Sequence, residues 1–572
     1  MIKEKDDVIL DISELAVNIS RDEGEISPLN GVSLRVKSGQ AVGIVGESGC
    51  GKTMTSNALL QILPVGAEIT SGQMLYRRKA DETLLDLAQI ESDSDEMRSV
   101  RGGEISMIFQ EPMTAFSPVH SIGNQIGEMV RLHDPMGESE ITDRVVELLD
   151  LVGIPSPRER IDDYPFQLSG GMRQRAMIAM ALASRPRLLI ADEPTTALDV
   201  TVQARVLKLI GRLQKELDLS LIMITHDLGV IAHTVEYVYV MKDGRVVEEG
   251  SVYDIFESPS HPHTIELLNS IPQSRTPVES GTSYHDGEFT AEMNEDDILY
   301  VQDLKKYFPV KRGLLQRQTG WVKAVDGVSF SVKKGEILGL VGESGSGKTT
   351  TGRMVLRVLD PTDGKIFFRK NDGGIVDMAS ISPQQVRQVR REMQMIFQDP
   401  FASLNPRMPV IDLISEPLRA SGWKRNECES RAVELMKQVG LDPAFLRRYP
   451  HAFSGGQRQR IGIARALALN PTFIVADEAV SALDVSVQSQ ILDLLKSLQK
   501  ELSLTLLFVS HDLSVVRSLC DNVAVMYNGK LVEYAPTEQL FENPQHSYTA
   551  ELLRAAPPPD PRAPWLQDYE VG

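Results

Sequence analysis

The chain has 572 residues, 42% of them hydrophobic, and a formal net charge of −19 at pH 7. This length allows two to four ordinary domains with full cores, and the anionic balance disfavours nucleic acid as a partner. The sequence has neither an apolar run long enough to span a bilayer nor an apolar N-terminal stretch that would direct secretion, so neither is expected.

The three cysteines, Cys50, Cys428 and Cys520, lie far apart and form no Cys-x-x-Cys pair. Zinc sites and iron–sulfur clusters need closely spaced cysteine sets, so we expect neither, and we expect no disulfide framework. Single, widely spaced cysteines are typical of proteins in a reducing cytoplasm.

In the first half, short apolar runs alternate with helical patterns. Ala41–Val45 predicts a buried parallel strand that ends at a glycine-rich loop, Gly46–Thr53. Apolar residues at helical spacing between Ile141 and Val152 predict an amphipathic helix. Two further buried strands and a hairpin are predicted: Leu188–Ala191 before Asp192-Glu193, Leu221–Ile224 before His226, and the hairpin Val238–Val247 around Asp243-Gly244.

The second half repeats these landmarks in the same order. Predicted strands again precede each motif: Ile337–Val341 before Gly342–Thr349, Phe473–Ala476 before Asp477-Glu478, Leu506–Val509 before His511, with a hairpin, Val523–Val532, around Asn528-Gly529. The pairs Ser169/Ser454, Asp192/Asp477 and His226/His511 are each 285 residues apart. Solenoid units span only a few tens of residues, so the repeat indicates a duplicated domain.

Composition places the boundaries between the copies. We expect a first domain over 1–273 that ends in a His-Pro-His-Thr segment, and a second domain over 298–555. Between them, 274–297 is acidic and poor in apolar residues, which predicts a flexible linker. The Pro-rich stretch 556–572 cannot continue a helix, so an extended tail is predicted there.

The two glycine-rich loops predict phosphate-binding sites. Their glycines let successive backbone N–H groups turn toward phosphate oxygens, and the following helix adds positive potential. Lys52 and Lys348 are expected to reach the β- and γ-phosphates, and Thr53 and Thr349 to ligate Mg²⁺.

The acidic pairs come at the ends of buried strands, where an unpaired carboxylate is costly. Asp192 and Asp477 are therefore expected to hold Mg²⁺, directly or through water. The next residue in each half, Glu193 or Glu478, is expected to polarise the attacking water. A histidine follows each glutamate after a further strand, and we expect His226 and His511 to sense the γ-phosphate.

Two further motifs become informative because they occur in the same order among the landmarks of both halves. Gln110 and Gln398 are expected to link Mg²⁺ or the attacking water to neighbouring structure. Ser169-Gly170-Gly171 and Ser454-Gly455-Gly456 open predicted helices and form a second N–H cradle for an anion in each half. One domain does not need two complete cradles for a single ATP.

Together these motifs resemble the nucleotide-binding domain of the ATP-binding cassette (ABC) family, over nearly the whole chain. The resemblance implies an α/β fold of two tandem P-loop domains, each with a RecA-like parallel-sheet core, an antiparallel β subdomain and an inserted helical subdomain. It also implies ATP and Mg²⁺ as ligands. Each ATP is expected between the glycine loop of one domain and the Ser-Gly-Gly signature of the other, which pairs Lys52 with Ser454–Gln457 and Lys348 with Ser169–Met172.

The resemblance assigns roles residue by residue. The residues implied to contact ATP are Gly46, Ser48, Gly49, Gly51, Lys52, Thr53, Gln110, Ser169, Gly170 and Gly171 in the first half, and Phe308, Gly342, Ser344, Gly345, Ser346, Gly347, Lys348, Thr349, Thr350, Gln398, Ser454, Gly455, Gly456 and Gln457 in the second. Those implied to hold Mg²⁺ are Thr53, Gln110, Asp192, Thr349, Gln398 and Asp477. Those implied to act in hydrolysis are Glu193, His226, Glu478 and His511.

Three positions depart from the family pattern. The aromatic residue expected to stack on adenine is Phe308 in the second half, but Ile19 stands at its place in the first. Met172 replaces the signature glutamine, and Ala479 replaces the proline usual after the catalytic glutamate. These changes predict two active sites that differ in affinity or rate.

Segments after each glutamine, and the Ser260–Thr264 and Gln545–Thr549 segments, resemble the oligopeptide/dipeptide importer ATPases. The resemblance implies an ATPase subunit at the cytoplasmic face of the inner membrane. Its implied partners are two transmembrane permease subunits and an extracytoplasmic solute-binding protein. His261 and His263 suggest a metal site, but the second copy keeps only His546, which favours a structural role.

Two other functions remain open on the sequence. A twin-cassette ATPase acting on ribosomes or DNA also lacks membrane spans, although such proteins carry longer charged linkers, coiled coils or cysteine-ligated zinc. A regulatory module that holds ATP without turnover conflicts with the presence of both Glu193 and Glu478. The sequence of this chain does not identify the solute that would be transported.

Overall fold

The computed structural model of the chain describes residues 7–21, 24–79, 81–134, 136–196, 198–271, 284–285, 293–312, 317–399, 402–481 and 483–565. The chain forms two compact units, one comprising Met1–Ser270 and Ala555–Gly572 and the other Ile271–Arg554. Most of the predicted linker 274–297, and the last part of the predicted tail 556–572, lie outside the described residues.

The first unit has an antiparallel sheet in the order β2-β1-β4-β5. Its strands are β1 (Val8–Arg21), β2 (Gly24–Lys37), β4 (Ala67–Arg77) and β5 (Leu84–Asp86). From Leu10 to Ser13, apolar and polar residues alternate along β1; at Glu14 φ is 51°, and the register shifts between Ile12 and Leu15. This bulge keeps Ile12 and Leu15 both buried although they are three positions apart.

The second sheet of this unit has the order β10-β9-β3-β8-β7-β6. All its neighbouring strands run parallel except the hairpin at one edge. Its strands are β3 (Ala41–Gly46), β6 (Ile105–Ile108), β7 (Leu188–Asp192), β8 (Ser220–Ile224), β9 (Tyr237–Lys242) and β10 (Arg245–Ser251). The central strands are continuous apolar runs, as strands covered on both faces must be.

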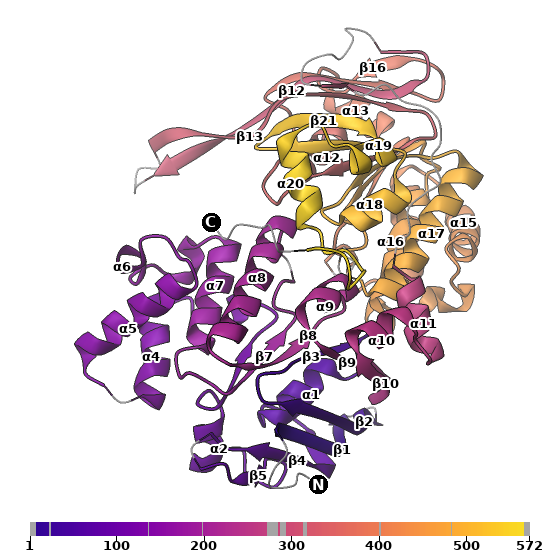
Figure 1. Cartoon of the computed structure of the whole chain (residues 1–572). Helices are drawn as coiled ribbons and strands as arrows, with labels where there is room; N and C mark the ends of the chain where they lie inside the picture. The colour runs from indigo at the N-terminus through magenta and orange to yellow at the C-terminus, as the bar shows by residue number, and fades with distance from the viewer. Residues whose placement is uncertain are drawn as a thin grey trace. The chain divides into compact units, whose positions relative to one another are not determined.

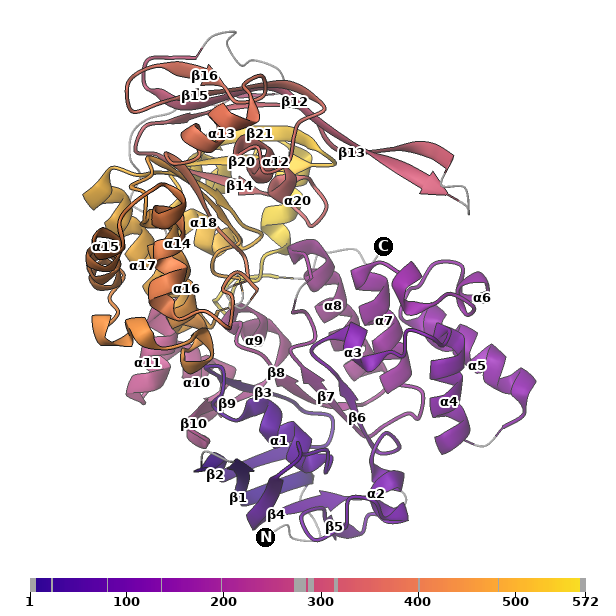
Figure 2. The same cartoon turned by 180° about the vertical axis from the view of Figure 1, so that it is seen from behind.

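Helices complete the first unit, and Figures 1 and 2 show α4, α5 and α7 gathered beyond the β6–β7 end of the sheet. The helices are α1 (Lys52–Leu59), α2 (Asp95–Val100), α3 (Pro112–Ala115), α4 (Ile122–His133), α5 (Glu138–Leu151), α6 (Pro157–Arg160), α7 (Gly170–Ala181), α8 (Val200–Glu216), α9 (Leu228–Thr234), α10 (Val252–Glu257) and α11 (Pro262–Asn269). Ile141, Val145, Leu148 and Leu149 form the buried face of α5, which confirms the predicted amphipathic helix.

The second unit repeats this architecture. Its antiparallel sheet has the order β13-β12-β15-β16 and its larger sheet the order β11-β21-β20-β14-β19-β18-β17. The strands are β11 (Tyr284–His285), β12 (Asp297–Arg312), β13 (Arg317–Lys333), β14 (Ile337–Val341), β15 (Asp363–Arg369), β16 (Ile375–Asp377), β17 (Met393–Ile396), β18 (Phe473–Asp477), β19 (Thr505–Val509), β20 (Asn522–Tyr527) and β21 (Lys530–Pro536). Both predicted hairpins are confirmed, as β9–β10 and β20–β21.

The helices of the second unit correspond to those of the first. They are α12 (Lys348–Val355), α13 (Pro383–Val389), α14 (Val410–Ala420), α15 (Arg425–Gln438), α16 (Gly455–Leu467), α17 (Val485–Leu502), α18 (Leu513–Leu519), α19 (Thr537–Glu542) and α20 (Ser547–Ala555). Each unit has a buried apolar core in which side chains of its antiparallel sheet pack against β-strands of the larger sheet. The predicted α/β fold of two tandem cassettes is therefore confirmed.

The last described residues of the chain pack within the first unit. The carbonyl oxygen of Pro558 lies 2.8 Å from Nε2 of His233 on α9. Arg562 forms a bidentate ion pair with Glu257 on α10, and the Trp565 ring lies 5.1 Å from the His233 ring between centroids. Helix α20 ends at Ala555, before the prolines, as the sequence predicts.

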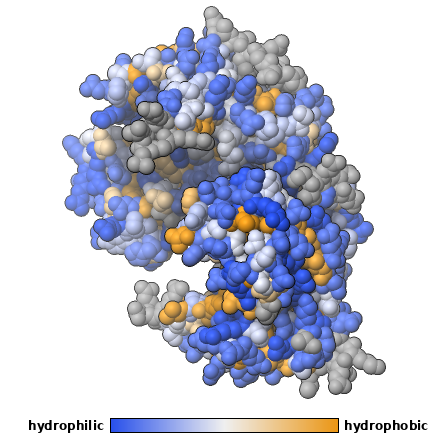
Figure 3. All heavy atoms as spheres, turned by 90° about the vertical axis from the view of Figure 1, so that its left-hand side faces the viewer, coloured by the Kyte–Doolittle hydropathy of each residue, from blue (hydrophilic) through white to orange (hydrophobic). Residues whose placement is uncertain are grey.

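Among the described residues, no helix is both long enough and apolar enough to cross a membrane. The face in Figure 3 is mostly hydrophilic, with hydrophobic side chains in small separate groups.

Candidate active sites

Each glycine-rich loop joins a strand to a helix: β3 to α1 in the first unit and β14 to α12 in the second. Gly51 and Gly347 precede the helices with φ of 107° and 104°, a left-handed conformation that favours glycine. A Cβ at Gly46 would lie 2.3 Å from the carbonyl oxygen of Met241. The loops therefore require glycine, and each delivers a helix N-terminus that favours an anion.

The lysine of each loop is folded back over the loop itself. Nζ of Lys52 donates to the carbonyl oxygens of Gly46 and Glu47 at 2.7 and 2.8 Å. Nζ of Lys348 makes the same two bonds, to Gly342 and Glu343. Both side chains are nearly buried and neutral carbonyls are their partners, so a phosphate oxygen can compete for these ammonium groups through its charge.

The strand-end aspartates fit a magnesium ion. Asp192 is 2% exposed, and its Oδ1 has no hydrogen-bond partner among the described residues. Burial raises the pKa of Asp192 to about 6, against a hydrogen bond from Thr53. In the second unit the Thr349 hydroxyl donates to Asp477 at 2.9 Å, and burial again raises the pKa of the aspartate. A carboxylate and a hydroxyl are oxygen ligands that Mg²⁺ accepts, and a cation would offset the cost of the buried charge.

Glu193 is the centre of a polar cluster in the first unit. Its Oε2 accepts hydrogen bonds from Gln110 at 2.6 Å and from Thr196 at 2.9 Å, and its Oε1 lies 3.0 Å from Nδ1 of His226. The structure thus brings three predicted site residues together, and adds Thr196. Gln110, which the sequence predicts to be a metal ligand, donates in this structure to Glu193 and not to the strand-end aspartate Asp192.

Glu478 has the same surroundings in the second unit. Gln398 donates to its Oε2 at 2.6 Å, and Nδ1 of His511 lies 3.2 Å from its Oε1. Ser481, which corresponds to Thr196, donates to the backbone oxygen of Glu478 instead of the carboxylate. Both glutamates also have unusual backbones, with φ of 45° for Glu193 and 47° for Glu478. Positive φ in a non-glycine residue is strained and is held by the surrounding structure.

The glutamates and histidines form ion pairs. Burial is the largest single influence and raises the pKa of Glu193, but the hydrogen bonds from His226 and Thr196 and the positive charges of His226 and Lys52 together outweigh it and lower the pKa of the carboxyl to about 2. Burial is the largest single influence and lowers the pKa of His226, but the hydrogen bond with Glu193 and the negative charges of Glu193 and Asp227 together outweigh it, so the net pKa is raised. In the second unit the pKa of Glu478 is likewise lowered and the pKa of His511 is likewise raised. Each pair is therefore best described as a carboxylate held by an imidazolium.

The two Ser-Gly-Gly motifs begin α7 and α16, as predicted. The hydroxyls of Ser169 and Ser454 accept the backbone N–H of the third residue beyond them, at 3.3 and 3.4 Å. In the second unit Gln457 also returns its side-chain oxygen to the N–H of Ser454, at 3.1 Å, and completes a capping box. Met172 cannot make this return bond, so the first signature helix lacks half of the box.

This difference predicts that Met172→Gln will stabilise the first unit. The new amide is expected to satisfy the N–H of Ser169 and to raise the free energy of unfolding by about 0.5–1 kcal/mol. Thermal unfolding of the variant, compared with wild type, measures the gain. Gln457→Met, the reverse exchange in the second unit, should lower stability by a similar amount; equal melting curves for all three proteins would contradict the prediction.

The predicted adenine-stacking residue is accessible in the second unit. Phe308 on β12 is 39% exposed, and Nζ of Lys306 lies 5.3 Å from its ring centroid. Ile19, at the corresponding place in the first unit, is half-buried on β1, opposite Ile26.

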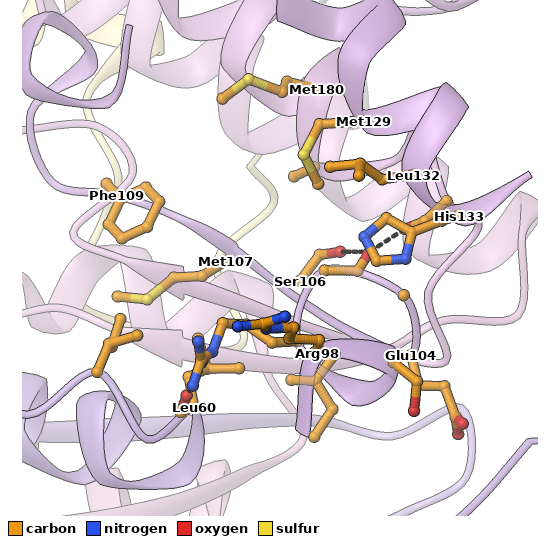
Figure 4. A pocket seen from close by; sticks show the side chains of 18 of the residues that line it. Leu60, Arg98, Glu104, Ser106, Met107, Phe109, Met129, Leu132, His133 and Met180 are labelled. Atoms are coloured by element: carbon orange, nitrogen blue, oxygen red, sulfur yellow. Dashed lines mark hydrogen bonds between the residues drawn. The ribbon is translucent and has the colours of Figure 1, made fainter. Parts of the chain in front are cut away.

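Each unit also has a cleft beside its glutamine motif. The cleft of the first unit has a volume of about 810 Å³ and is lined by β6, α2, α4 and α7. Figure 4 shows Met107 and Phe109 on one wall and Met129, Leu132 and Met180 on the helices opposite. The cleft of the second unit, of about 700 Å³, is more polar and includes Gln398, Glu416 and Arg465.

The sequence matches the family described as ABC transporter over residues 29–196 and 325–481. It also matches the oligopeptide/dipeptide transporter C-terminal region over 247–288 and 532–570. Both matches occur twice, once in each copy of the duplicated sequence.

Curated relatives match almost from end to end. The glutathione import ATP-binding protein GsiA of Salmonella paratyphi A is 47% identical over 569 residues, which cover 97% of this chain and 90% of the relative. The protein of the same name from Escherichia coli K12 is 46% identical over 578 residues, with the same coverage. Among solved structures, the ATP-binding cassette MJ0796 bound to ADP and phosphate is 28% identical, with a TM-score of 0.37, and covers 42% of this chain and 98% of its own.

Proposed function

The chain belongs to the ABC transporter family, and from this membership we propose that it is the ATP-hydrolysing subunit of an importer for glutathione or similar small peptides. The observation that carries the proposal is the match to glutathione import ATP-binding proteins over 97% of the chain. The paired oligopeptide/dipeptide C-terminal regions support the same substrate class.

ATP binding is assigned to the glycine loops. Lys52 and Lys348 would exchange their bonds to loop carbonyls for bonds to phosphate oxygens. Asp192 and Asp477, with Thr53 and Thr349, would hold Mg²⁺, which supplies charge neutralisation on the phosphates. Phe308 would stack on the adenine in the second site, and the first site, with Ile19, would bind it less firmly.

Hydrolysis is assigned to the two glutamates. Glu193 and Glu478 accept hydrogen bonds from a glutamine and a histidine, and these bonds hold the carboxylates in one orientation. A carboxyl with a pKa near 2 is a weak base while the histidine pairs with it. His226 or His511 can exchange this bond for one to a phosphate oxygen, which would free the carboxylate to orient and deprotonate water.

The signature motifs are proposed to complete the sites across the two cassettes. Ser454–Gln457 would contact the ATP held by Lys52, and Ser169–Met172 the ATP held by Lys348. This pairing rests on the family resemblance. Their serine-capped helix starts supply backbone N–H groups suited to the γ-phosphate.

The clefts beside the glutamine motifs are the proposed docking sites for two permease subunits. Phe109, the residue before Gln110, lines the first cleft and Gln398 lines the second, so a segment seated in either cleft would lie beside a glutamine motif. The first cleft includes Arg98 and Glu104 but has the more apolar surface, and the second contains Glu416 and Arg465, so we expect the segment seated in the first cleft to be the more apolar of the two. The chain would act at the cytoplasmic face of the membrane.

Affinity purification of the tagged protein from detergent-solubilised membranes tests this assignment. Mass spectrometry should identify two multi-span proteins and an extracytoplasmic solute-binding protein. Recovery of ribosomal proteins or DNA-repair factors with no permease would overturn the importer and favour a twin-cassette ATPase of another kind.

A further inference from the structure

A tyrosine from the C-terminal region of the second unit contacts the phosphate-binding loop. The hydroxyl of Tyr548, the second residue of α20, accepts the backbone N–H of Glu343 at 3.0 Å. Tyr548 is 6% exposed, and its ring stacks on Tyr527 at the end of β20 with centroids 4.1 Å apart. The two residues joined by the hydrogen bond are 205 positions apart in the chain.

The loop residue that Tyr548 holds is also the one that the lysine holds. Glu343 is the second residue of the loop, directly after Gly342. Its carbonyl oxygen accepts from Nζ of Lys348 at 2.8 Å, while its N–H donates to Tyr548. Tyr548 and Lys348 therefore fix the same residue through different atoms, and the position of the loop entry depends on both.

The backbone at the tyrosine is itself held by a frame of hydrogen bonds that involves Glu533 and His546. The carboxylate of Glu533 on β21 accepts the backbone N–H groups of Gln545 and His546, at 2.9 and 3.0 Å. Nδ1 of His546 then accepts the N–H of Tyr548 at 3.2 Å. Glu533 is 3% exposed, so these charge-assisted bonds are shielded from water.

The first unit has the frame without the tyrosine. Glu248 accepts the N–H groups of Ser260 and His261, and Nδ1 of His261 accepts the N–H of His263 at 3.2 Å. His263 stands where the second unit has Tyr548, and Lys242 stands where it has Tyr527. The imidazole of His263 is buried, and neither of its nitrogens has a hydrogen-bond partner within the described part of the chain.

We propose that Tyr548 is a positioning residue for ATP at the second site, and that the first site lacks this support. The inference rests on the proposed function, since it assumes that both loops bind ATP. The C-terminal region then contributes to the second nucleotide site but not to the first. This gives the two sites a difference in ATP affinity that is separate from the effect of Phe308.

Tyr548→Phe tests the proposal, because it removes the hydroxyl and keeps the stacked ring. The full chain also carries Lys52→Ala, so that a fluorescent ATP analogue reports on the second loop. We expect the dissociation constant to rise about fivefold, the effect of one lost hydrogen bond. Without nucleotide, the melting temperature should stay within about 2 °C of the parent protein.

The first unit supplies the matched control. His263→Phe, measured in the Lys348→Ala background, should change the dissociation constant less than about twofold, because His263 holds no loop N–H. Tyr548→His, which copies the first unit, should weaken binding as Tyr548→Phe does. Unchanged affinity in Tyr548→Phe, or a lower melting temperature with unchanged affinity, would show a merely structural role. If Lys52→Ala and Lys348→Ala proteins both failed to bind the analogue, the proposed ATP sites themselves would be wrong.

Discussion

Replacing both Glu193 and Glu478 by glutamine will lower the rate of ATP hydrolysis by about 10²–10⁴-fold, the range for loss of a positioned acid–base group. Glutamine has nearly the shape of glutamate and can still bond to the neighbouring glutamine and histidine. It lacks the negative charge that orients and deprotonates water. ATP binding should therefore remain, because no phosphate ligand is removed.

The measurement is phosphate release by the purified protein at saturating Mg–ATP, together with nucleotide affinity. Glu216→Gln and Glu501→Gln provide the control, because these exposed glutamates lie in the last turns of α8 and α17, at equivalent places in the two units. The control pair should hydrolyse ATP at the wild-type rate. A double glutamine variant at positions 193 and 478 with more than a tenth of that rate would show that other residues activate the water.

Asp192→Asn will have opposite effects on stability and on catalysis. Burial raises the pKa of Asp192 to about 6 from an ordinary 3.8, so the ionised carboxylate destabilises the nucleotide-free fold at neutral pH. Removal of this charge should raise the free energy of unfolding by about 2–3 kcal/mol at pH 7.5. Hydrolysis should fall by about 100-fold or more, because the carboxylate no longer holds the metal.

The stability gain should depend on pH with a defined sign. An acid whose pKa is raised on folding favours the folded state below its unfolded pKa, and this contribution is lost as the pH rises through the folded value. The difference between Asp192→Asn and wild type should thus be small below pH 4 and reach its full size above pH 6. Chemical denaturation at several pH values measures it.

Asp477→Asn is the comparison for this effect. Both aspartates accept a hydrogen bond from a threonine, but Arg353 also lies 3.9 Å from Asp477, so this carboxylate is better compensated. We expect a smaller gain in stability with an equal loss of activity. A destabilised Asp192→Asn protein, or one with a pH-independent gain, would contradict the idea that an incompletely compensated charge is built into the metal site.

The sequence predicted the architecture because local chemistry and local structure agree in this chain. The apolar runs Ala41–Val45 and Phe473–Ala476 form central strands, since only a sheet covered on both faces buries such runs fully. The turns at Asp243-Gly244 and Asn528-Gly529 are hairpins because their residues tolerate positive φ.

Other features depend on contacts that no local pattern encodes. Tyr548 was visible only as part of a repeated segment, and its bond to Glu343 joins two ends of a domain. The bond from Thr196 to Glu193 had no sequence signal, and in the second unit Ser481 turns elsewhere. The positive φ of both glutamates follows from the strand-to-loop geometry around them, since glutamate has no preference for that conformation.

The most direct test of the whole account is ATP-dependent uptake of labelled glutathione by cells in which this chain is replaced by the Glu193→Gln/Glu478→Gln variant. The account predicts that the wild-type and Glu216→Gln/Glu501→Gln chains support uptake and that the double variant at the catalytic positions does not. Equal uptake with all three chains would contradict the claim that hydrolysis at these two sites drives import.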